Sequence, residues 1–378
     1  MKITIDIRNI GKGRTGDEVV FFELVKNLAL IDERNEYFLL LDSREKLEIK
    51  KIKSRLGIIK KQNFKIVELG SGNKFIWNAL NVPKFCRKQK IDIYHTQYII
   101  PIFMPKHTKI VTHIHDVSFR VHKELISWKD AFFLNFLIPY ALGKADLILA
   151  VSQFTKDEII KYYNTPSEKI EVIYNASSLK KVNDNWQEIK EKYNLPDKYI
   201  LALGTMQPRK NIPFLIKAFG EVADKIPGIS LVLVGGKAHN FDDLITQTIE
   251  KHPNIKNRII FTGYVGEDDK FMIFEKAQLF VFPSLYEGFG VPILEAMDAG
   301  TRVLASDIPP HIEIGGESVI YANPTDIDRW KKMLYDCLVS GKIKKDVFAE
   351  GEKLRESFSW RKSAQKLLTL YEKLGQTK

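Results

Sequence analysis

The stretch Pro283-Ser-Leu-Tyr-Glu-Gly-Phe-Gly-Val-Pro-Ile-Leu-Glu-Ala-Met297 carries the strongest structural signal in this sequence. It begins at the end of a short apolar run, residues 279–283, and passes through two turn glycines, Gly288 and Gly290. An apolar segment follows, with Pro292 at a position that suits the first turn of a helix. A buried strand, a glycine turn and a helix in this order are typical of a parallel α/β sheet.

The same alternation extends over the whole chain. Short, mostly apolar, β-branched runs predict strands buried on both faces, at residues 2–7, 37–41, 64–69, 91–95, 109–115, 147–151 and 170–173, then 199–204, 230–235, 259–263, 279–283, 302–306 and 319–322. Segments with helical periodicity lie between them, at 18–30, 77–89, 128–142, 156–163, 211–223, 242–251, 268–275, 292–299 and 326–338. The polar stretch 175–194 separates the two series of strands.

We therefore expect an α/β fold of two Rossmann-like domains, each a doubly wound parallel sheet, that face a deep cleft. The predicted domains are residues 1–175 and 176–355, followed by a C-terminal helix within 356–378 that could cross back to the first domain. The length of 378 residues agrees with two domains, because one hydrophobic core rarely grows beyond about 250–300 residues.

The composition predicts a cytoplasmic protein. The two cysteines, Cys86 and Cys337, are far apart and favour a reducing compartment over a disulfide framework. No apolar run at the start suits a signal peptide, and none elsewhere reaches the ~18–20 residues of a membrane span.

The net charge of +11 falls mostly in residues 1–175 and is densest over residues 50–65. This surface could meet an anionic partner, such as the inner face of a membrane or a lipid-diphosphate acceptor, or it could simply be solvated. Nucleic acid is not expected, because the basic run lacks interleaved aromatic residues. The aromatic helix expected at 128–140 could likewise face a lipid, although aromatic residues at helical spacing more often form a core.

The glycine turn of the opening stretch suits a phosphate ligand. Unpaired N–H groups at the N-terminus of the helix, together with its positive dipole end, favour a diphosphate or a hydroxyl. Glu287 in the turn and Glu295 one helical turn inside could each accept hydrogen bonds from sugar hydroxyls.

This stretch resembles the E-x7-E signature of retaining glycosyltransferase family 4, which has the GT-B fold. The resemblance implies that Glu287 holds the donor sugar and that Glu295 binds the nucleotide ribose. It also places the backbone of the turn against the sugar and the diphosphate, at Gly288, Phe289, Gly290 and Val291.

A second motif is Leu203-Gly-Thr-Met-Gln-Pro-Arg-Lys-Asn211, where a strand gives way to a helix. Two cations in this loop, Arg209 and Lys210, would stabilise a departing nucleoside diphosphate, and one such interaction is commonly worth ~3–4 kcal/mol. The family carries the same Pro-Arg-Lys-Asn string, and its Arg and Lys bind the diphosphate. The resemblance also places Gly204 and Thr205 among the donor-binding residues. Many relatives have a further Arg directly after this glycine, where this chain has Thr205.

A third motif is Thr112-His-Ile-His-Asp116. His113 and His115 alternate along a strand and so share a face. No Cys, His or carboxylate cluster follows that would complete a metal site, so no metal is expected. The resemblance places His115 beside the reacting sugar with Asp116 next to it, and leaves His113 to packing.

Two further residues are assigned through the resemblance. In the loop from Gly11 to Glu18, Gly16 corresponds to the first glycine of the family's phosphate loop, whereas Glu18 replaces the second. Val265 follows a strand whose end reads the base in the family. From the residues themselves, Ser152 is expected to cap the helix that follows it.

Together these observations predict a retaining, metal-independent hexosyltransferase without a cofactor. It would move a hexose, with mannose slightly preferred, from GDP-mannose or a UDP-sugar to a saccharide or lipid-linked acceptor in polysaccharide, lipopolysaccharide or glycolipid synthesis. Two alternatives stay open: a GT-B epimerase that acts on a nucleotide sugar, and a non-catalytic nucleotide-sugar-binding subunit. Glycoside hydrolysis is disfavoured, because no acid–nucleophile pair of carboxylates is evident.

Overall fold

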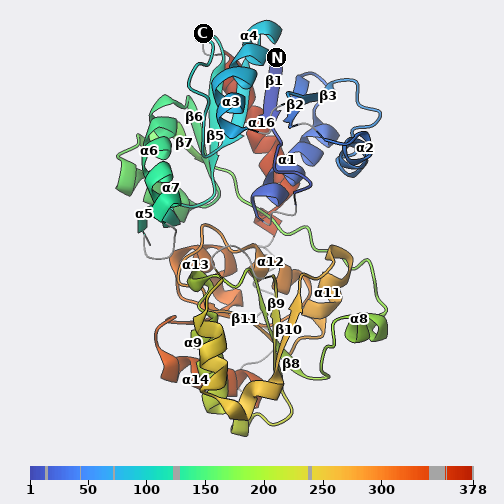
Figure 1. Ribbon diagram of the computed structural model, residues 1–378, viewed down its shortest axis with the longest axis vertical. Coiled ribbons are helices and arrows are strands. Elements are labelled where there is room, and N and C mark those ends of the chain that lie inside the picture. Colours follow the sequence, from blue (N-terminus) through green and yellow to red (C-terminus); the bar gives the residue numbers. More distant parts are fainter. Residues whose placement is uncertain are drawn as a thin grey trace. The chain divides into compact units, whose positions relative to one another are not determined.

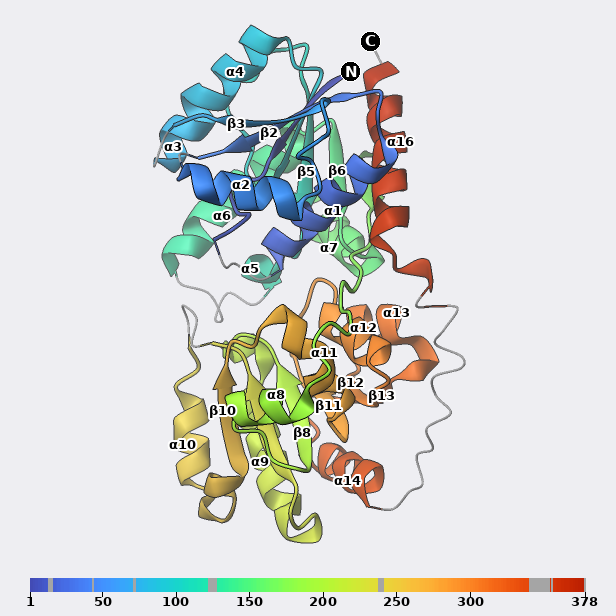
Figure 2. The same cartoon turned by 90° about the vertical axis from the view of Figure 1, so that its right-hand side faces the viewer.

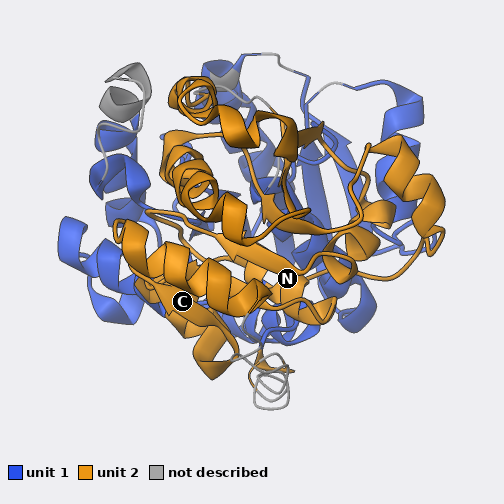
Figure 3. Ribbon diagram, turned by 90° about the horizontal axis from the view of Figure 1, so that it is seen from below, with its two compact units in different colours: residues 1–121, 128–175, 358–378 blue, residues 122–127, 176–357 orange. Residues whose placement is uncertain are grey.

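A computed structural model describes residues 1–12, 16–42, 44–70, 73–121, 128–236, 241–339, 354 and 356–376. The chain divides into two compact units, shown in different colours in Figure 3. Unit 1 contains Met1–Val121, Trp128–Asn175 and Phe358–Lys378, and unit 2 is built on Ala176–Ser357. The chain passes from one unit to the other between Asn175 and Ala176, and returns before Phe358.

Unit 1 contains a seven-stranded parallel sheet in the order β3-β2-β1-β4-β5-β6-β7. Its strands are β1 (Lys2–Asp6), β2 (Glu36–Leu41), β3 (Phe64–Glu68), β4 (Ile93–Gln97), β5 (Lys109–Ile114), β6 (Leu147–Ala150) and β7 (Ile170–Val172). The helices around it are α1 (Asp17–Ile31), α2 (Lys46–Arg55), α3 (Lys74–Ile76), the π-helix η1 (Trp77–Asn81), α4 (Val82–Gln89), α5 (Ser118–Val121), α6 (Trp128–Lys144) and α7 (Gln153–Tyr163).

The C-terminal helix α16 (Trp360–Gln376) belongs to unit 1, where it packs against α1 (Figure 2). Its apolar side buries Trp360, Ala364, Leu367 and Tyr371. These residues recur three to four positions apart, which is the spacing of one helical face. The last helix of the chain is therefore part of the first sheet's covering layer.

Unit 2 contains a six-stranded parallel sheet in the order β10-β9-β8-β11-β12-β13. Its strands are β8 (Tyr199–Leu203), β9 (Ser230–Val234), β10 (Ile259–Gly263), β11 (Leu279–Phe282), β12 (Val303–Ser306) and β13 (Ile320–Ala322). Its main helices are α8 (Trp186–Lys192), the 3-10 turn η4 (Pro208–Lys210), α9 (Ile212–Val222), α10 (Leu244–Glu250), α11 (Glu267–Glu275), α12 (Val291–Asp298), α13 (Pro309–Gly315) and α14 (Ile327–Leu338), as Figure 1 shows for most of them.

The predicted α/β fold with two Rossmann-like parallel sheets is confirmed. Each predicted strand is present within two residues of its expected bounds, because the strands buried on both faces are continuous apolar runs. Ser152 caps α7 as expected, since its Oγ accepts the backbone N–H of Thr155 at 3.0 Å. Several helices lie where none was predicted. Among them, α2 carries part of the basic run, α8 falls within the stretch 175–194 that was predicted to be a polar break, and the short helices α5 and α13 follow β5 and β12.

Candidate functional site

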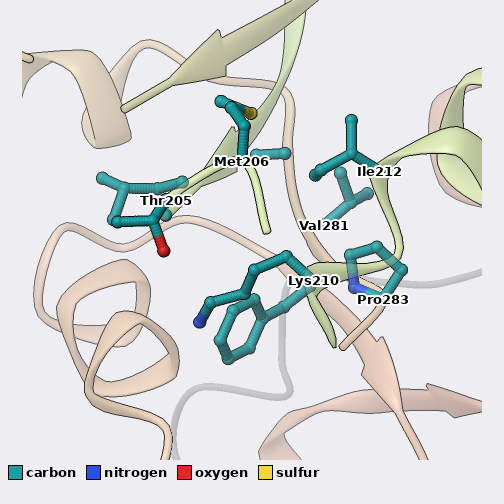
Figure 4. A pocket seen from close by; sticks show the side chains of 10 residues that line it. Thr205, Met206, Lys210, Ile212, Val281 and Pro283 are labelled. Atoms are coloured by element: carbon teal, nitrogen blue, oxygen red, sulfur yellow. The ribbon is translucent and has the colours of Figure 1, made fainter. Parts of the chain in front are cut away.

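The candidate site lies at the point in unit 2 where the sheet reverses its direction of growth. From β8 the chain adds β9 and β10 on one side, whereas β11, β12 and β13 follow on the other. The loops after β8 and β11 therefore diverge, and ligands of open α/β sheets bind where neighbouring strand ends diverge in this way. Figure 4 shows a small pocket at these ends, lined by residues that include Thr205, Met206, Lys210, Val281 and Pro283.

Glycine is required where β8 ends. Gly204 has φ 150°, and a Cβ at this position would stand 3.2 Å from Cε of Lys210. On the neighbouring strand, Gly235 has φ 137°, and a Cβ there would stand only 2.0 Å from the carbonyl oxygen of Gly204. Because neither residue has a Cβ, the two backbones can approach each other closely, and the side chain of Lys210 can extend past Gly204.

The two predicted cations converge on one carboxylate. Arg209 Nη1 lies 2.7 Å from Glu287 Oε2, and Lys210 Nζ lies 2.5 Å from Glu287 Oε1. The hydroxyl of Ser284 donates to the same Oε1 at 2.8 Å. Glu287 and Lys210 are each only 8% exposed, whereas the Arg209 side chain is about one quarter exposed. One buried carboxylate thus forms ion pairs with two cations.

Electrostatics hold this cluster in its charged form. Burial alone would raise the pKa of Glu287, but Arg209 and Lys210 outweigh it and hold the pKa well below the usual range of a carboxyl group. The Lys210 ammonium lies 4.8 Å from the centre of the Phe282 ring, and His311 stacks on the same ring. Burial lowers the pKa of His311 to about 4, so that this imidazole is neutral beside the cations.

The loop after β11 is fixed to the loop after β8 through its backbone. Leu285 N–H donates to the carbonyl of Arg209 at 2.8 Å, and the side-chain amide of Asn211 donates to the carbonyl of Pro283 at 3.2 Å. Gly290 then caps α12 with φ 134°, a conformation that favours glycine. The start of α12 presents backbone N–H groups, with the buried Phe289 before it and Val291 as its first residue.

The second predicted carboxylate has a partner of its own. Glu295 lies inside α12, 7% exposed, and forms an ion pair with Lys270 of α11 at 2.5 Å. Burial raises the pKa of Glu295, although Lys270 opposes this effect. The pKa of Lys270 is itself raised, because Glu295 and Glu267 outweigh the cost of its burial. Glu287 and Glu295 therefore stand in two distinct charge environments.

The predicted acceptor-side residues belong to unit 1. His115 follows β5, and its Nε2 lies 3.0 Å from Oε1 of Gln97. Its ring stacks on His113 with centroids 5.0 Å apart. Asp116 uses its carboxylate locally, since Oδ1 accepts the N–H and the hydroxyl of Ser118 at the start of α5. His113 is fully buried, as expected of a packing residue.

The two residues assigned through weaker motifs lie at loop positions. Gly16 caps α1 with φ 73°, while the Glu18 carboxylate accepts the backbone N–H of Gly11 at 2.8 Å. Residues 13–15 of this loop lie outside the described residues. Val265 follows β10, the edge strand that is separated from β8 by β9.

The described part of the chain contains no group of three or more His, Cys, Asp or Glu side chains arranged to hold a metal ion. Within the same residues, no helix is both long enough and apolar enough to cross a bilayer.

Several residues of the site were not predicted from the sequence. Ser284 lies within the stretch from Pro283 to Met297. Its position three residues before Glu287 could have predicted a hydrogen bond between the two side chains. Lys270 and His311 reach the site from α11 and α13, and the sequence has no spacing that links either of them to α12.

Comparison with known proteins gives matches over both units. Residues 16–180 match the family described as Glycosyltransferase Family 4, and residues 197–339 match the family described as Glycosyl transferases group 1. The O-antigen chain mannosyltransferase B of Escherichia coli is 31% identical over 298 residues, which cover 76% of this chain and 76% of that protein. The O-antigen chain mannosyltransferase RfbU of Salmonella typhimurium is 31% identical over 259 residues, 68% of this chain and 67% of that protein.

Solved structures match the fold over the whole chain. Sucrose-phosphate synthase from Thermosynechococcus elongatus aligns with a TM-score of 0.76 at 17% identity, over 99% of both chains. Anabaena Alr3699/HepE in complex with UDP-glucose aligns with a TM-score of 0.73 at 17% identity, over 99% of this chain and all of that one.

Proposed function

The chain belongs to glycosyltransferase family 4 and has the GT-B fold, and on that basis we propose that it transfers a hexose from a nucleoside-diphosphate sugar to an acceptor hydroxyl with retention. Mannose is the preferred hexose, because relatives that cover two thirds or more of the chain are named as O-antigen mannosyltransferases. The acceptor class that fits these names is a growing saccharide or a lipid-linked saccharide.

One observation carries the proposal: the Arg209–Glu287–Lys210 cluster at the ends of β8 and β11. A nucleoside diphosphate gains negative charge as the glycosidic bond breaks. Arg209 and Lys210 place two positive charges at this point of the site, and preorganised cations of this kind stabilise such charge. Because two fixed cations supply the countercharge, we propose that transfer needs no metal ion.

The remaining residues take roles around this centre. The N–H groups at the start of α12 suit the diphosphate, and Glu295 suits the hydroxyls of the ribose. Glu287 suits the donor sugar, since it is held in the charged form between the cations. On the acceptor side we propose His115, with Asp116 positioning the loop through Ser118.

The test begins with donor binding. GDP-mannose, UDP-sugars and ADP-sugars are compared by their effect on thermal unfolding, since a donor at 100 times its Kd adds ~2.7 kcal/mol of stability. Slow release of nucleoside diphosphate, with water in place of the acceptor, then reports bond cleavage. We expect GDP-mannose to stabilise the protein and to be cleaved without added metal.

Lys210→Ala should lower this cleavage by roughly 10²–10³-fold, because one charge-stabilising interaction is lost. Lys251→Ala is the matched control, since Lys251 is an exposed lysine of unit 2. Normal activity in Lys210→Ala would refute the role of the cluster. Conversion of the donor to an epimer without release of nucleotide would refute transfer itself.

A further inference from the structure

One side of unit 1 exposes large apolar side chains on three segments of the chain. They are Phe75, Ile76 and Leu80 on α3 and η1, Ile102 and Phe103 on the loop between β4 and β5, and Phe136 on α6. Phe75 is 73% exposed, Phe103 61% and Phe136 77%. Single exposed apolar residues are ordinary, but a group of them on connected elements marks an interaction surface.

Packing beneath these residues connects the three segments. Met104 contacts the cluster that contains Trp77 and Val82 under η1 and α4, and it also contacts the cluster that contains Ala141 of α6. The hydroxyl of Tyr140 on α6 donates to the carbonyl of Ile102 at 3.4 Å. The loop therefore lies between the two helical segments, and Figure 2 shows α3, α4 and α6 along the same side of unit 1.

The chemistry of the loop tip is unusual for a surface that faces only water. Ile102 and Phe103 form the turn itself, while the prolines on either side, Pro101 and Pro105, are buried and hold it in place. Turn tips in water are normally occupied by Gly, Asn, Asp or Ser. Two exposed apolar side chains at a fixed tip are suited to insertion into an apolar phase.

Basic residues surround this apolar group. Lys84, Arg87 and Lys88 are exposed on α4, and they continue the helical face of Ile76 and Leu80 at spacings of three to four residues. Lys106 is exposed beside the loop tip. Between residues 73 and 107 the sequence has a single acidic residue, Asp92, and its carboxylate accepts the backbone N–H of Lys2.

We propose that this surface, named the 75–103 patch, docks unit 1 on an anionic lipid bilayer. Phe75, Leu80, Ile102 and Phe103 enter the interface between headgroups and acyl chains, while the lysines and Arg87 contact anionic headgroups. A lipid surface fits better than a protein, because lysine is depleted in protein interfaces, whereas its long side chain can reach headgroups around an inserted apolar residue. The basic run on α2, which is the densest in the sequence, is not part of the patch.

The experiment is flotation of the full chain with vesicles of phosphatidylcholine alone or with one third phosphatidylglycerol. The chain should float with the anionic vesicles and hardly with the neutral ones, and added salt should weaken binding. The pair Ile102→Ser and Phe103→Ser, and separately the triple change Lys84→Gln, Arg87→Gln and Lys88→Gln, should each lower the partition coefficient at least tenfold.

The matched control changes a basic and apolar surface elsewhere on the same unit. Lys50→Gln, Lys51→Gln and Arg55→Gln on α2 with Ile59→Ser should alter partition less than twofold, since Ile59 is as exposed as Phe103. Equal binding to neutral vesicles, unchanged binding of the patch variants, or loss of binding in the α2 control would overturn the proposal. A dimer in sedimentation velocity that the patch changes dissociate would also overturn it, by assigning the surface to a second copy. Donor binding is measured in parallel with the same variants. A failure of the membrane proposal can then be distinguished from a failure of the proposed function.

Discussion

At the scale of single residues, Glu287 is the centre of the charge balance in unit 2. It is the counter-ion of Arg209 and Lys210 within the protein, and the same carboxylate is proposed to hold the donor sugar. The cations are thus held in place before a diphosphate arrives, which keeps the cost of reorganisation low.

Replacing Glu287 with Gln should lower the free energy of unfolding by about 3 kcal/mol, because two partly buried cations lose their counter-ion. The measurement is urea unfolding at pH 7, with Glu275→Gln as control. Glu275 pairs with Lys181 at the surface, where a pair is worth less than about 1 kcal/mol. Equal stability of Glu287→Gln and the wild type would show that the cluster is not coupled to folding.

The difference in stability between the wild type and Glu287→Gln should depend on pH, and the sign of this dependence follows from the lowered pKa of Glu287. In the unfolded chain this carboxyl takes up a proton near pH 4.3, whereas in the folded chain it stays ionised to lower pH. Its contribution is therefore complete above about pH 5 and declines as the pH falls. The stability difference between wild type and Glu287→Gln should be constant from pH 6 to 8 and shrink below pH 4.3; a difference that grows toward acid would contradict the assignment.

The sequence motifs predicted which residues belong to the site better than they predicted which side chains pair with each other. Arg209 and Lys210 were predicted to bind the diphosphate and Glu287 the donor sugar, so the three were expected at one site, and their side chains do meet. The pairing of Glu295 with Lys270 could not be read from sequence, because it depends on how α11 packs against α12.

At the scale of elements, β4, β5 and α16 enclose a column of three imidazoles. His95 stacks on His113, and His113 stacks on His115. His95 Nδ1 lies 2.6 Å from the Tyr371 hydroxyl of α16. The column therefore links the C-terminal helix to His115, the proposed acceptor-side residue. Its inner pair, His95 and His113, is buried.

Mild acid should destabilise unit 1, because His95 and His113 take up protons only in the unfolded chain. Burial lowers the pKa of His95 to about 3 and that of His113 well below its ordinary value. Between pH 7 and 5 the unfolded chain binds these protons and the folded chain does not, so stability falls by about 2 kcal/mol for each histidine. His113→Phe, which keeps a ring in the column, should reduce this loss by about half in urea unfolding at the two pH values.

The control for that prediction is His107→Asn, since His107 is exposed on the loop before β5. It should leave the pH dependence unchanged. An unaltered acid slope in His113→Phe would show that His113 is not held in its neutral form.

Elements differed in how readily the sequence predicted them. The strands were predicted because their apolar runs are continuous. The helix α2 was missed because only Ile52 is buried within its ten residues, so its periodicity is hidden among lysines. The helix α8 was missed because its surroundings are polar, although Asn185 three residues before Glu188 is a capping signal, and the Asn185 side chain accepts the Glu188 N–H.

At the scale of the whole molecule, residues distant in sequence share one core. Unit 1 is completed by α16, which lies more than 180 residues beyond the end of its other segments and packs on α1. Unit 2 has its own core, formed by residues of β8, β9, α9 and α14 among others. We infer that the two units unfold as separate cooperative blocks.

Native-state hydrogen exchange in rising urea tests this inference, because it reports each segment's opening free energy. Residues 360–376 should exchange together with β1, β4 and α1, and not with α14, which precedes them in the chain. A nucleoside diphosphate should slow exchange in unit 2, most of all at residues 204–211 and 284–291, since every proposed diphosphate ligand except Gly16 belongs to unit 2. Because unit 1 would gain little from that ligand, its opening free energy should stay nearly constant; joint exchange of residues 360–376 with α14 would refute the division.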